Sequence, residues 1–219
     1  MTPDFNKAAI KASEILIKHN ISTAPIDPMP ILKKTPGVLV MTFAEMSDKV
    51  NMDRKNLIGM FGCENQDAVT TVYLVEGEKR YLVTYNQQLP FGVLQRALAR
   101  ELGHIVLGHD GTRPESVRQE EATCFAHHLL CPRALVHSIQ ATGIRLTKEV
   151  VGSMTGFSAH CITCIRKTPA TNVPPELNRI VRDQFMPYAT NFFEFQQYAS
   201  LKDGSAIMDF GTFMDGYDE

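Results

Sequence analysis

The sequence lacks the excess of basic residues that nucleic-acid-binding proteins use to attract phosphate groups. Its 22 Lys and Arg residues are balanced by 24 Asp and Glu residues, which gives a formal net charge of -2 at pH 7. No local run of Lys and Arg compensates for this balance. Because affinity for a nucleic-acid backbone depends on clustered positive charge, we expect no direct nucleic-acid binding and assign no residue to it.

Long apolar runs are also missing from the chain. No stretch approaches the roughly 18 apolar residues that a membrane-spanning helix needs. The opening residues, MTPDFNKAAIKASE, lack the basic segment and the apolar core of a signal peptide. We therefore expect a cytoplasmic protein that does not associate with a membrane.

Cysteine is scarce, since the chain has five cysteines without the regular spacing of a disulfide framework. Free thiols in a reducing compartment are the simplest expectation. The segment His160-Cys161-x-x-Cys164 has the spacing of some redox and zinc motifs, but no second cysteine pair follows it. Because the segment falls in a predicted helix, we interpret Cys161 as a core residue.

Hydrophobic periodicity divides the chain into an early part with strands and a later part with helices. After an opening helix over 5–19, strands are predicted at 37–43, 70–75 and 80–85, and a turn at Gly77 joins the last two as a β-hairpin. Further helices are predicted at 90–109, 114–130, 133–140, 146–154, 158–167 and 176–185. This order predicts the α+β class with a small antiparallel sheet.

One predicted helix carries a segment close to a metal-binding motif. Residues 96–110 are RALARELGHIVLGHD, so Arg100, Glu101 and His104 occupy the positions of a His-Glu-x-x-His sequence. In that motif two imidazoles four residues apart bind zinc, and the glutamate deprotonates the metal-bound water. At about 100° per residue, Glu101 and His104 lie on the same side of the helix as Arg100, and Leu102 faces the core. Arginine therefore replaces the first ligand in an otherwise suitable helix.

A second segment makes the likeness to a known family specific. ALARELGHIVLGH followed by EEATCFAHHLLCP resembles the core of the ImmA/IrrE family of zinc metallopeptidases. In that family a His-Glu-Leu-Gly-His run and a further Leu-Gly-His precede Glu-Ala-x-x-Phe-Ala-x-x-Leu-Leu-x-Pro. The resemblance implies a metallopeptidase-fold domain over residues 1–168, with a zincin-like helical core packed against the sheet. Residues 169–219 would then form a C-terminal helical extension with an acidic tail.

The resemblance also implies roles for individual residues. Glu101 matches the general base, and His104 and Glu121 match two of the three zinc ligands. Arg100 stands at the remaining ligand position, and arginine stays protonated and has no lone pair to give a metal ion. We therefore interpret Glu101, His104 and Glu121 as vestigial, and we expect no metal cofactor.

Arg100 is predicted to replace the metal structurally. Its guanidinium would form a fork-shaped ion pair with Glu121, and with Glu101 as well. Removing one partner of a buried ion pair costs about 3 to 5 kcal/mol, because it leaves a buried charge without compensation. A cation supplied by the polypeptide would remove that cost.

A zinc site rebuilt from other ligands is the alternative. His109 is expected about 140° around the helix from His104, so the two should not readily share an ion. His128 is two helical turns from Glu121 and is equally unsuitable. Cys124 is one turn from Glu121 and is the best substitute ligand. A set of His104, Glu121 and Cys124 is chemically acceptable for zinc.

Two functions from different classes follow from these alternatives. A degenerate metallopeptidase-fold protein would act by binding a protein partner, such as a transcriptional repressor or another regulator of a mobile element or phage. An active zinc endopeptidase with a rebuilt ligand set would instead cleave a DNA-binding repressor. The arginine at position 100 favours the first function, and a measurement of bound zinc separates the two.

Overall fold

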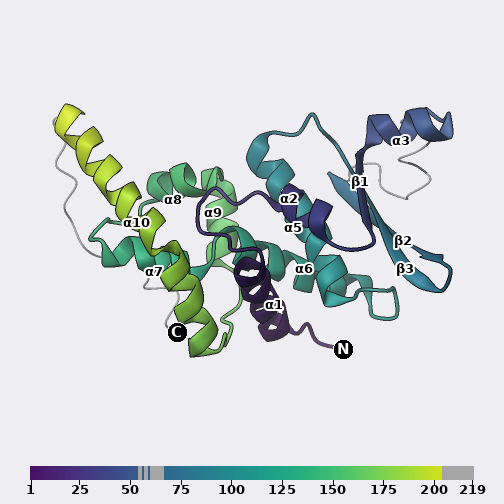
Figure 1. Cartoon of the computed structure of the whole chain (residues 1–219), viewed down its shortest axis with the longest axis horizontal. Coiled ribbons are helices and arrows are strands. Elements are labelled where there is room, and N and C mark those ends of the chain that lie inside the picture. The colour runs from purple at the N-terminus through teal and green to yellow at the C-terminus, as the bar shows by residue number, and fades with distance from the viewer. Residues whose placement is uncertain (54–55, 57–58, 60–66, 204–219) are drawn as a thin grey trace. The chain divides into compact units, whose positions relative to one another are not determined.

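The computed structural model describes residues 1–53, 56, 59 and 67–203, with side chains described as far as Tyr198 (Figure 1). These residues form an α+β protein in which helices predominate beside one small sheet. Within them, no helix combines the length and the apolarity that crossing a membrane requires. The chain packs as two compact units, residues 1–3 with 27–126 and residues 4–26 with 127–219. The boundary predicted at residue 168 falls inside the second unit.

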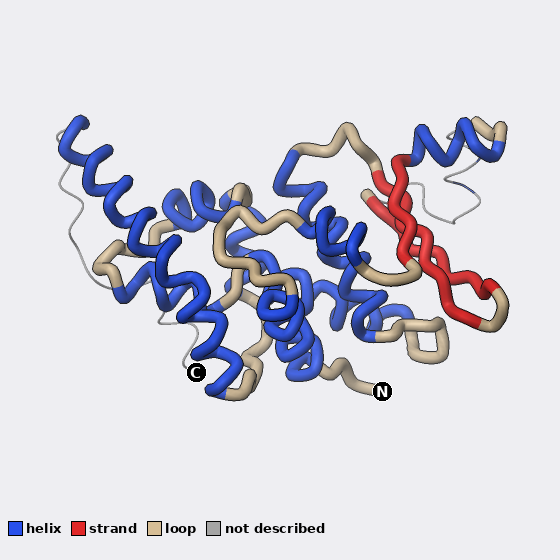
Figure 2. The backbone as a smooth tube through the Cα atoms, viewed as in Figure 1, coloured by secondary structure: helices blue, strands red, loops and turns tan. Residues whose placement is uncertain are grey.

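The strands of the sheet, red in Figure 2, belong to the first unit, and their pairing is mixed. β2 (Ala68–Val75) and β3 (Glu78–Tyr85) form the predicted antiparallel hairpin, with Gly77 at a positive φ in its turn. β1 (Val38–Thr42) pairs with β3 in parallel, which gives the order β1-β3-β2. The prediction of an antiparallel sheet is therefore wrong for this pair. Residues 43–67 separate β1 from the hairpin, and a connection of that length permits a parallel return.

Helix α2 (Pro28–Lys34) begins in a proline-rich passage and is not among the helices predicted from the sequence. Its N-cap is Asp27, whose side chain accepts a hydrogen bond from the backbone N–H of Met29 at 2.9 Å. Proline is favourable in the first turn of a helix, because the N–H group that it lacks would have no partner there. Proline breaks a helix only beyond the first turn, so the prolines of this passage are compatible with the start of α2.

The core of the first unit lies between α2, the sheet and α5 (Phe91–Leu107). α2 packs against β1 and α5, and α5 packs against β2 and β3. Fully buried apolar side chains fill the contacts, among them Leu32, Val83, Leu98 and Leu102. A short helix, α3 (Phe43–Val50), follows β1 and begins with a capping box formed by Thr42 and Glu45.

Helix α6 (Glu115–Leu130) packs closely on α5 through a glycine. A Cβ atom at Gly103 would lie 3.0 Å from Cδ1 of Phe125 and 3.3 Å from Cα of Ala122. Contacts of that length are too short for ordinary packing, so the missing side chain at position 103 permits the close approach. The two segments that resemble the metallopeptidase motif are thereby held against each other.

The second unit is helical. Its helices besides the end of α6 are α1 (Phe5–Lys18), α7 (Arg133–Ala141), α8 (Lys148–Thr155), α9 (Ala159–Arg166) and α10 (Pro175–Asp203). α10 packs against α7 and α1 and continues far beyond the predicted end at residue 185. It runs through Pro187 because Phe185 and Ala189, on either side of the proline, are fully buried. Cys161 of α9 is buried, as predicted.

Candidate functional site

Glu101 lies on α5 at the wall of a cavity, where a side chain of the sheet holds its carboxyl group. Oγ1 of Thr70 in β2 donates a 2.8 Å hydrogen bond to Oε2 of Glu101. The other oxygen, Oε1, is 3.8 Å from Nη2 of Arg100, within ion-pair range but too far for a hydrogen bond. Only 4% of Glu101 is exposed. The predicted general base is therefore a buried carboxyl group fixed from the sheet side.

The turn after α5 brings His109 back to His104. The backbone N–H of His109 donates to the carbonyl of His104, and the Nδ1 atoms of the two rings are 2.8 Å apart. The expectation that these histidines point apart is wrong, because it continued the helix through residue 109. α5 ends at Leu107, and Gly108 reverses the chain in the left-handed conformation with a φ of 71°.

Glu121 reaches the same place from α6, and its main partners are not the predicted ones. Its side chain is 2% exposed, and Oε2 is 2.7 Å from Nη1 of Arg113 and 3.0 Å from Nε2 of His109. Arg113 lies in the loop between α5 and α6, and its Nη2 also donates to the carbonyl of Thr2 at 3.3 Å. The cation that compensates the buried Glu121 is therefore supplied by Arg113.

The prediction that Arg100 forms a fork with Glu121 is wrong. Among the described residues, Arg100 forms an ion pair only with Glu101, and the 3.8 Å distance does not allow the two parallel hydrogen bonds of a fork. Its side chain is 30% exposed and borders the cavity, while its buried Nε has no hydrogen-bond partner in the described part of the chain. Arg113 therefore supplies the guanidinium group that pairs with Glu121, and Arg100 is a charged residue of the cavity wall.

Burial sets the ionisation of Glu101. It raises the pKa of this carboxyl group to about 7, although the Thr70 hydroxyl and the Arg100 charge act in the opposite direction. A carboxyl group with a pKa near neutrality exchanges a proton readily at physiological pH. That property suits a general base, but buried structural carboxyl groups share it.

The two histidines of the site are neutral at pH 7. The pKa of His104 is lowered to about 4, chiefly by burial, and the electrostatic effects of the neighbouring His109, Arg100 and Arg118 act in the same direction. Burial also lowers the pKa of His109, and this effect exceeds the opposing effect of Glu121. Since both rings are neutral, one nitrogen of the close Nδ1 pair carries a hydrogen and the other accepts it.

A cavity of about 330 Å³ adjoins these residues within the first unit. Its volume falls in the range of about 300 to 1,000 Å³ that is usual for small-ligand sites. β2 and β3 form one wall, α5 forms a second, and the following loop with the start of α6 forms the third. Its charged and polar lining includes Thr70, Arg100, Glu101, His104, Asp110 and Arg118.

The donors at this site do not fit a zinc ion. Structural and catalytic zinc sites gather three or more His, Cys, Asp or Glu ligands around one point. The described residues contain no such group. His104 contacts His109 with Nδ1, and Oε2 of Glu121 is shared by Arg113 and His109. Cys124 is buried in α6, but it does not complete a ligand set with His104 and Glu121.

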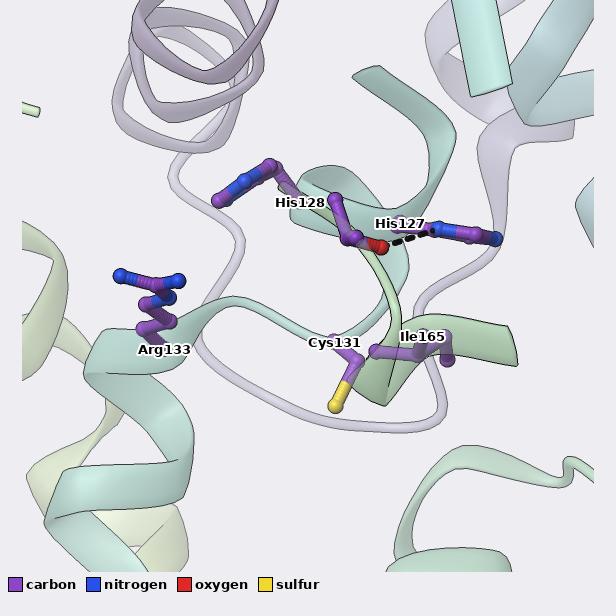
Figure 3. Close-up of a pocket in the computed structure, with 6 residues that line it drawn as sticks. His127, His128, Cys131, Arg133 and Ile165 are labelled. Carbon is purple, nitrogen blue, oxygen red and sulfur yellow. Dashed lines mark hydrogen bonds between the residues drawn. The ribbon is translucent and has the colours of Figure 1, made fainter. Parts of the chain in front are cut away.

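A much smaller cavity lies in the second unit at the end of α6 (Figure 3). Its volume of about 20 Å³ admits a single water molecule. Nδ1 of His127 is 2.7 Å from Oγ1 of Thr168, and Nε2 of His128 is 3.1 Å from Oγ1 of Thr171. Burial raises the pKa of the Cys131 thiol to about 12, which makes it a poor nucleophile. The hydrogen bonds of His127 and His128 hold the end of α6 to Thr168 and Thr171.

The pairing of Glu121 with His109 and Arg113, and of Glu101 with Thr70, was not predicted from the sequence. A signal for His109 was present, because glycine commonly ends helices in the left-handed conformation and Gly108 precedes this histidine. No sequence pattern links Arg113 to Glu121, since Arg113 lies in an irregular loop. Thr70 is paired with Glu101 only by the tertiary packing of β2 on α5.

Comparison with known proteins does not identify a relative. No family model matches the chain, and neither a curated protein nor a solved structure does. The likeness to metallopeptidases therefore rests on the motif residues of α5 and α6.

Proposed function

We propose that this chain is a degenerate metallopeptidase-fold protein, similar to the ImmA/IrrE family, that acts in the cytoplasm by binding a protein partner. A transcriptional repressor or another regulator of a mobile element is the partner class that the resemblance implies. α5 and α6, with the hairpin beside them, would be the zincin-like part of the fold. Glu101, His104 and Glu121 would be the remnants of its catalytic base and ligands.

The ion pair between Arg113 and Glu121 carries this proposal. To bind zinc, Glu121 would have to leave a guanidinium 2.7 Å away and an imidazole 3.0 Å away. Arg100 brings a second positive charge to the position of the missing ligand. Two unit charges about 4 Å apart repel by about 4 kcal/mol at an effective dielectric constant near 20, and a divalent ion is repelled more strongly. Both arginines therefore oppose a metal ion.

The edge of the sheet supports binding of a polypeptide. β2 is the outer strand in the order β1-β3-β2, so one side of its backbone has no strand partner among the described residues. Val72 borders the cavity, and Leu74, two residues farther along the same face, is 69% exposed. An extended segment that pairs with β2 would cover these side chains and enter the cavity.

One observation favours the alternative function, an active zinc endopeptidase that cleaves a DNA-binding repressor. Burial raises the pKa of Glu101 to about 7, which suits a general base. This alternative requires Glu121 to leave Arg113 and a new ligand set to form, with Cys124 as the substitute ligand. The base has little to activate until that set exists.

Zinc content and proteolysis test the proposal together. The full chain is refolded in excess zinc, dialysed and analysed for bound metal, and it is co-expressed with repressors from mobile elements. We expect substoichiometric zinc and intact repressors. Stoichiometric zinc that disappears in Glu121→Gln, together with cleavage that disappears in Glu101→Gln, would establish the endopeptidase instead.

A further inference from the structure

Two guanidinium groups border the larger cavity from different helices. Arg100 lies on α5 and Arg118 on α6, and both line the cavity. Both also lower the pKa of His104 through their charge, so His104 lies near the two of them. Two positive charges therefore lie near His104, the residue that would bind a metal cation in a metallopeptidase.

Neither guanidinium group has hydrogen-bond acceptors for all of its N–H donors among the described residues. Nε of Arg118 donates to the carbonyl of Arg113 at 3.1 Å, and within the described chain its terminal nitrogens have no hydrogen-bond acceptor. Over the residues that the structure describes, the only ion pair of Arg100 is the 3.8 Å one with Glu101. A guanidinium carries five N–H donors in a planar fork, and that fork matches the two oxygens of a carboxylate.

The acidic residues that line the cavity leave N–H donors of Arg100 and Arg118 available for a ligand. Glu101 accepts its short hydrogen bond from Thr70. The Asp110 carboxylate accepts hydrogen bonds from the Thr112 hydroxyl and backbone at 2.7 and 3.2 Å, and it is 3.6 Å from Nζ of Lys79. Glu115 is exposed in the first turn of α6 and forms no ion pair with any described residue.

We propose that Arg100 and Arg118 bind a carboxylate of a partner polypeptide, so that the cavity receives an acidic residue of a segment lying along β2. This inference rests on the proposed function and names the chemistry that the partner presents. The cavity of about 330 Å³ accommodates an Asp or Glu residue with its adjoining backbone. A singly charged carboxylate fits better than a phosphate group, because Asp110 and Glu115 also line the cavity and repel a second negative charge.

Arginine side-chain NMR tests this binding without a known partner. The Nε–Hε signals of ¹⁵N-arginine-labelled full chain are followed during titration with glutamate whose amino and carboxyl termini are both blocked. We expect saturable shifts of the Arg100 and Arg118 signals with millimolar affinity, because two charge-assisted contacts act together on one carboxylate. The equally blocked glutamine should produce no saturable shift.

Matched variants separate specific binding from a general charge effect. Arg118→Gln and Arg100→Gln should each weaken binding about tenfold or more, because each removes one charge-assisted contact. Arg100→Lys should also weaken it, because lysine keeps the charge but loses the fork. Arg96→Gln removes the same charge one turn earlier on α5, outside the cavity lining, and should leave the affinity unchanged.

Each result decides for or against carboxylate binding. The proposal is wrong if blocked glutamate gives no saturable shift, if Arg118→Gln and Arg96→Gln behave alike, or if inorganic phosphate binds more tightly. Tighter binding of N-acetylglutamine, whose only carboxylate is terminal, would contradict an acidic side chain as the ligand and identify a chain terminus instead. If the carboxylate does not bind, the measurements of zinc content and repressor cleavage keep their meaning. Failure of this inference is therefore distinguishable from failure of the proposed function.

Discussion

Nη1 of Arg113 lies 2.7 Å from Oε2 of Glu121, and the same oxygen is 3.0 Å from Nε2 of His109. His109 in turn meets His104 through their Nδ1 atoms. This series of contacts from Arg113 to His104 gives protein partners to Glu121 and His104, which the resemblance matches to zinc ligands. Protein stability, rather than metal affinity, should be the property most sensitive to this network.

Arg113→Gln should lower the free energy of unfolding by about 2 kcal/mol, measured by urea denaturation at pH 7. The expected loss is below that of a fully buried pair, because the Arg113 side chain is 27% exposed and His109 still contacts Glu121. Arg80→Gln is the matched control, since Arg80 pairs with the exposed Glu78 and its loss should cost less than about 1 kcal/mol. Equal effects of the two substitutions would show that Glu121 does not depend on Arg113.

Arg100→His alone should not restore zinc binding, although it restores the motif His-Glu-x-x-His. Glu121 remains tied to Arg113 and His109 in that variant. The double variant Arg100→His with Arg113→Gln releases Glu121, and it should bind zinc with an affinity measurable by competition with a chromogenic chelator. Strong zinc binding by the single variant would mean that Arg113 leaves Glu121 readily.

The helical part of the site was predictable, and the loop part was not. The spacing of Arg100, Glu101 and His104 follows from the fixed period of a helix, so their common face could be derived from the sequence. The partner of Glu121 was assigned to Arg100 by its place in the motif, whereas the structure supplies Arg113 from a loop. Loop residues have no period, and their contacts depend on tertiary packing.

The fold, too, has a part that local sequence patterns predict and a part that depends on tertiary packing. The alternation of residues in the hairpin and the proline and glycine signals between helices located most elements within a few residues. The parallel pairing of β1 with β3 and the continuation of α10 past Pro187 were not predicted. Both depend on which distant surface each segment covers, and periodicity along the chain does not contain that information.

Gly103→Ala should destabilise the protein although alanine favours helices. The new methyl group would lie 3.0 Å from the ring of Phe125, which is fully buried, and 3.3 Å from the backbone of Ala122. Overpacking costs about 1 to 3 kcal/mol, which exceeds the gain in helix propensity of about 1 kcal/mol. Thermal unfolding should show a lower midpoint for this variant. Combining it with Phe125→Leu should cost less than the sum of the single variants, because the smaller side chain gives the methyl group room.

His128 should make the protein sensitive to acid. Burial lowers its pKa to about 4 from an ordinary value near 6.5, with Arg133 and His127 adding to the effect. The unfolded chain therefore binds a proton that the folded chain excludes, and stability falls as the pH drops from about 6.5 towards 4. Between pH 7.5 and 4.5 this group should remove about 2 to 3 kcal/mol of unfolding free energy.

The acid effect of His128 is measured as a difference between variants. Urea denaturation of His128→Gln at both pH values should show a smaller loss on acidification than the unmodified chain shows, whatever the stability of the variant at pH 7.5. His160→Gln is the control, because His160 is exposed and its removal should leave the acid-induced loss unchanged. If His128→Gln and the unmodified chain lost the same free energy, protonation of His128 would not oppose folding. The buried site of His128, where its ring contacts Thr171, would then accept a charged imidazole. Burial of a charge is normally unfavourable, so we do not expect this result.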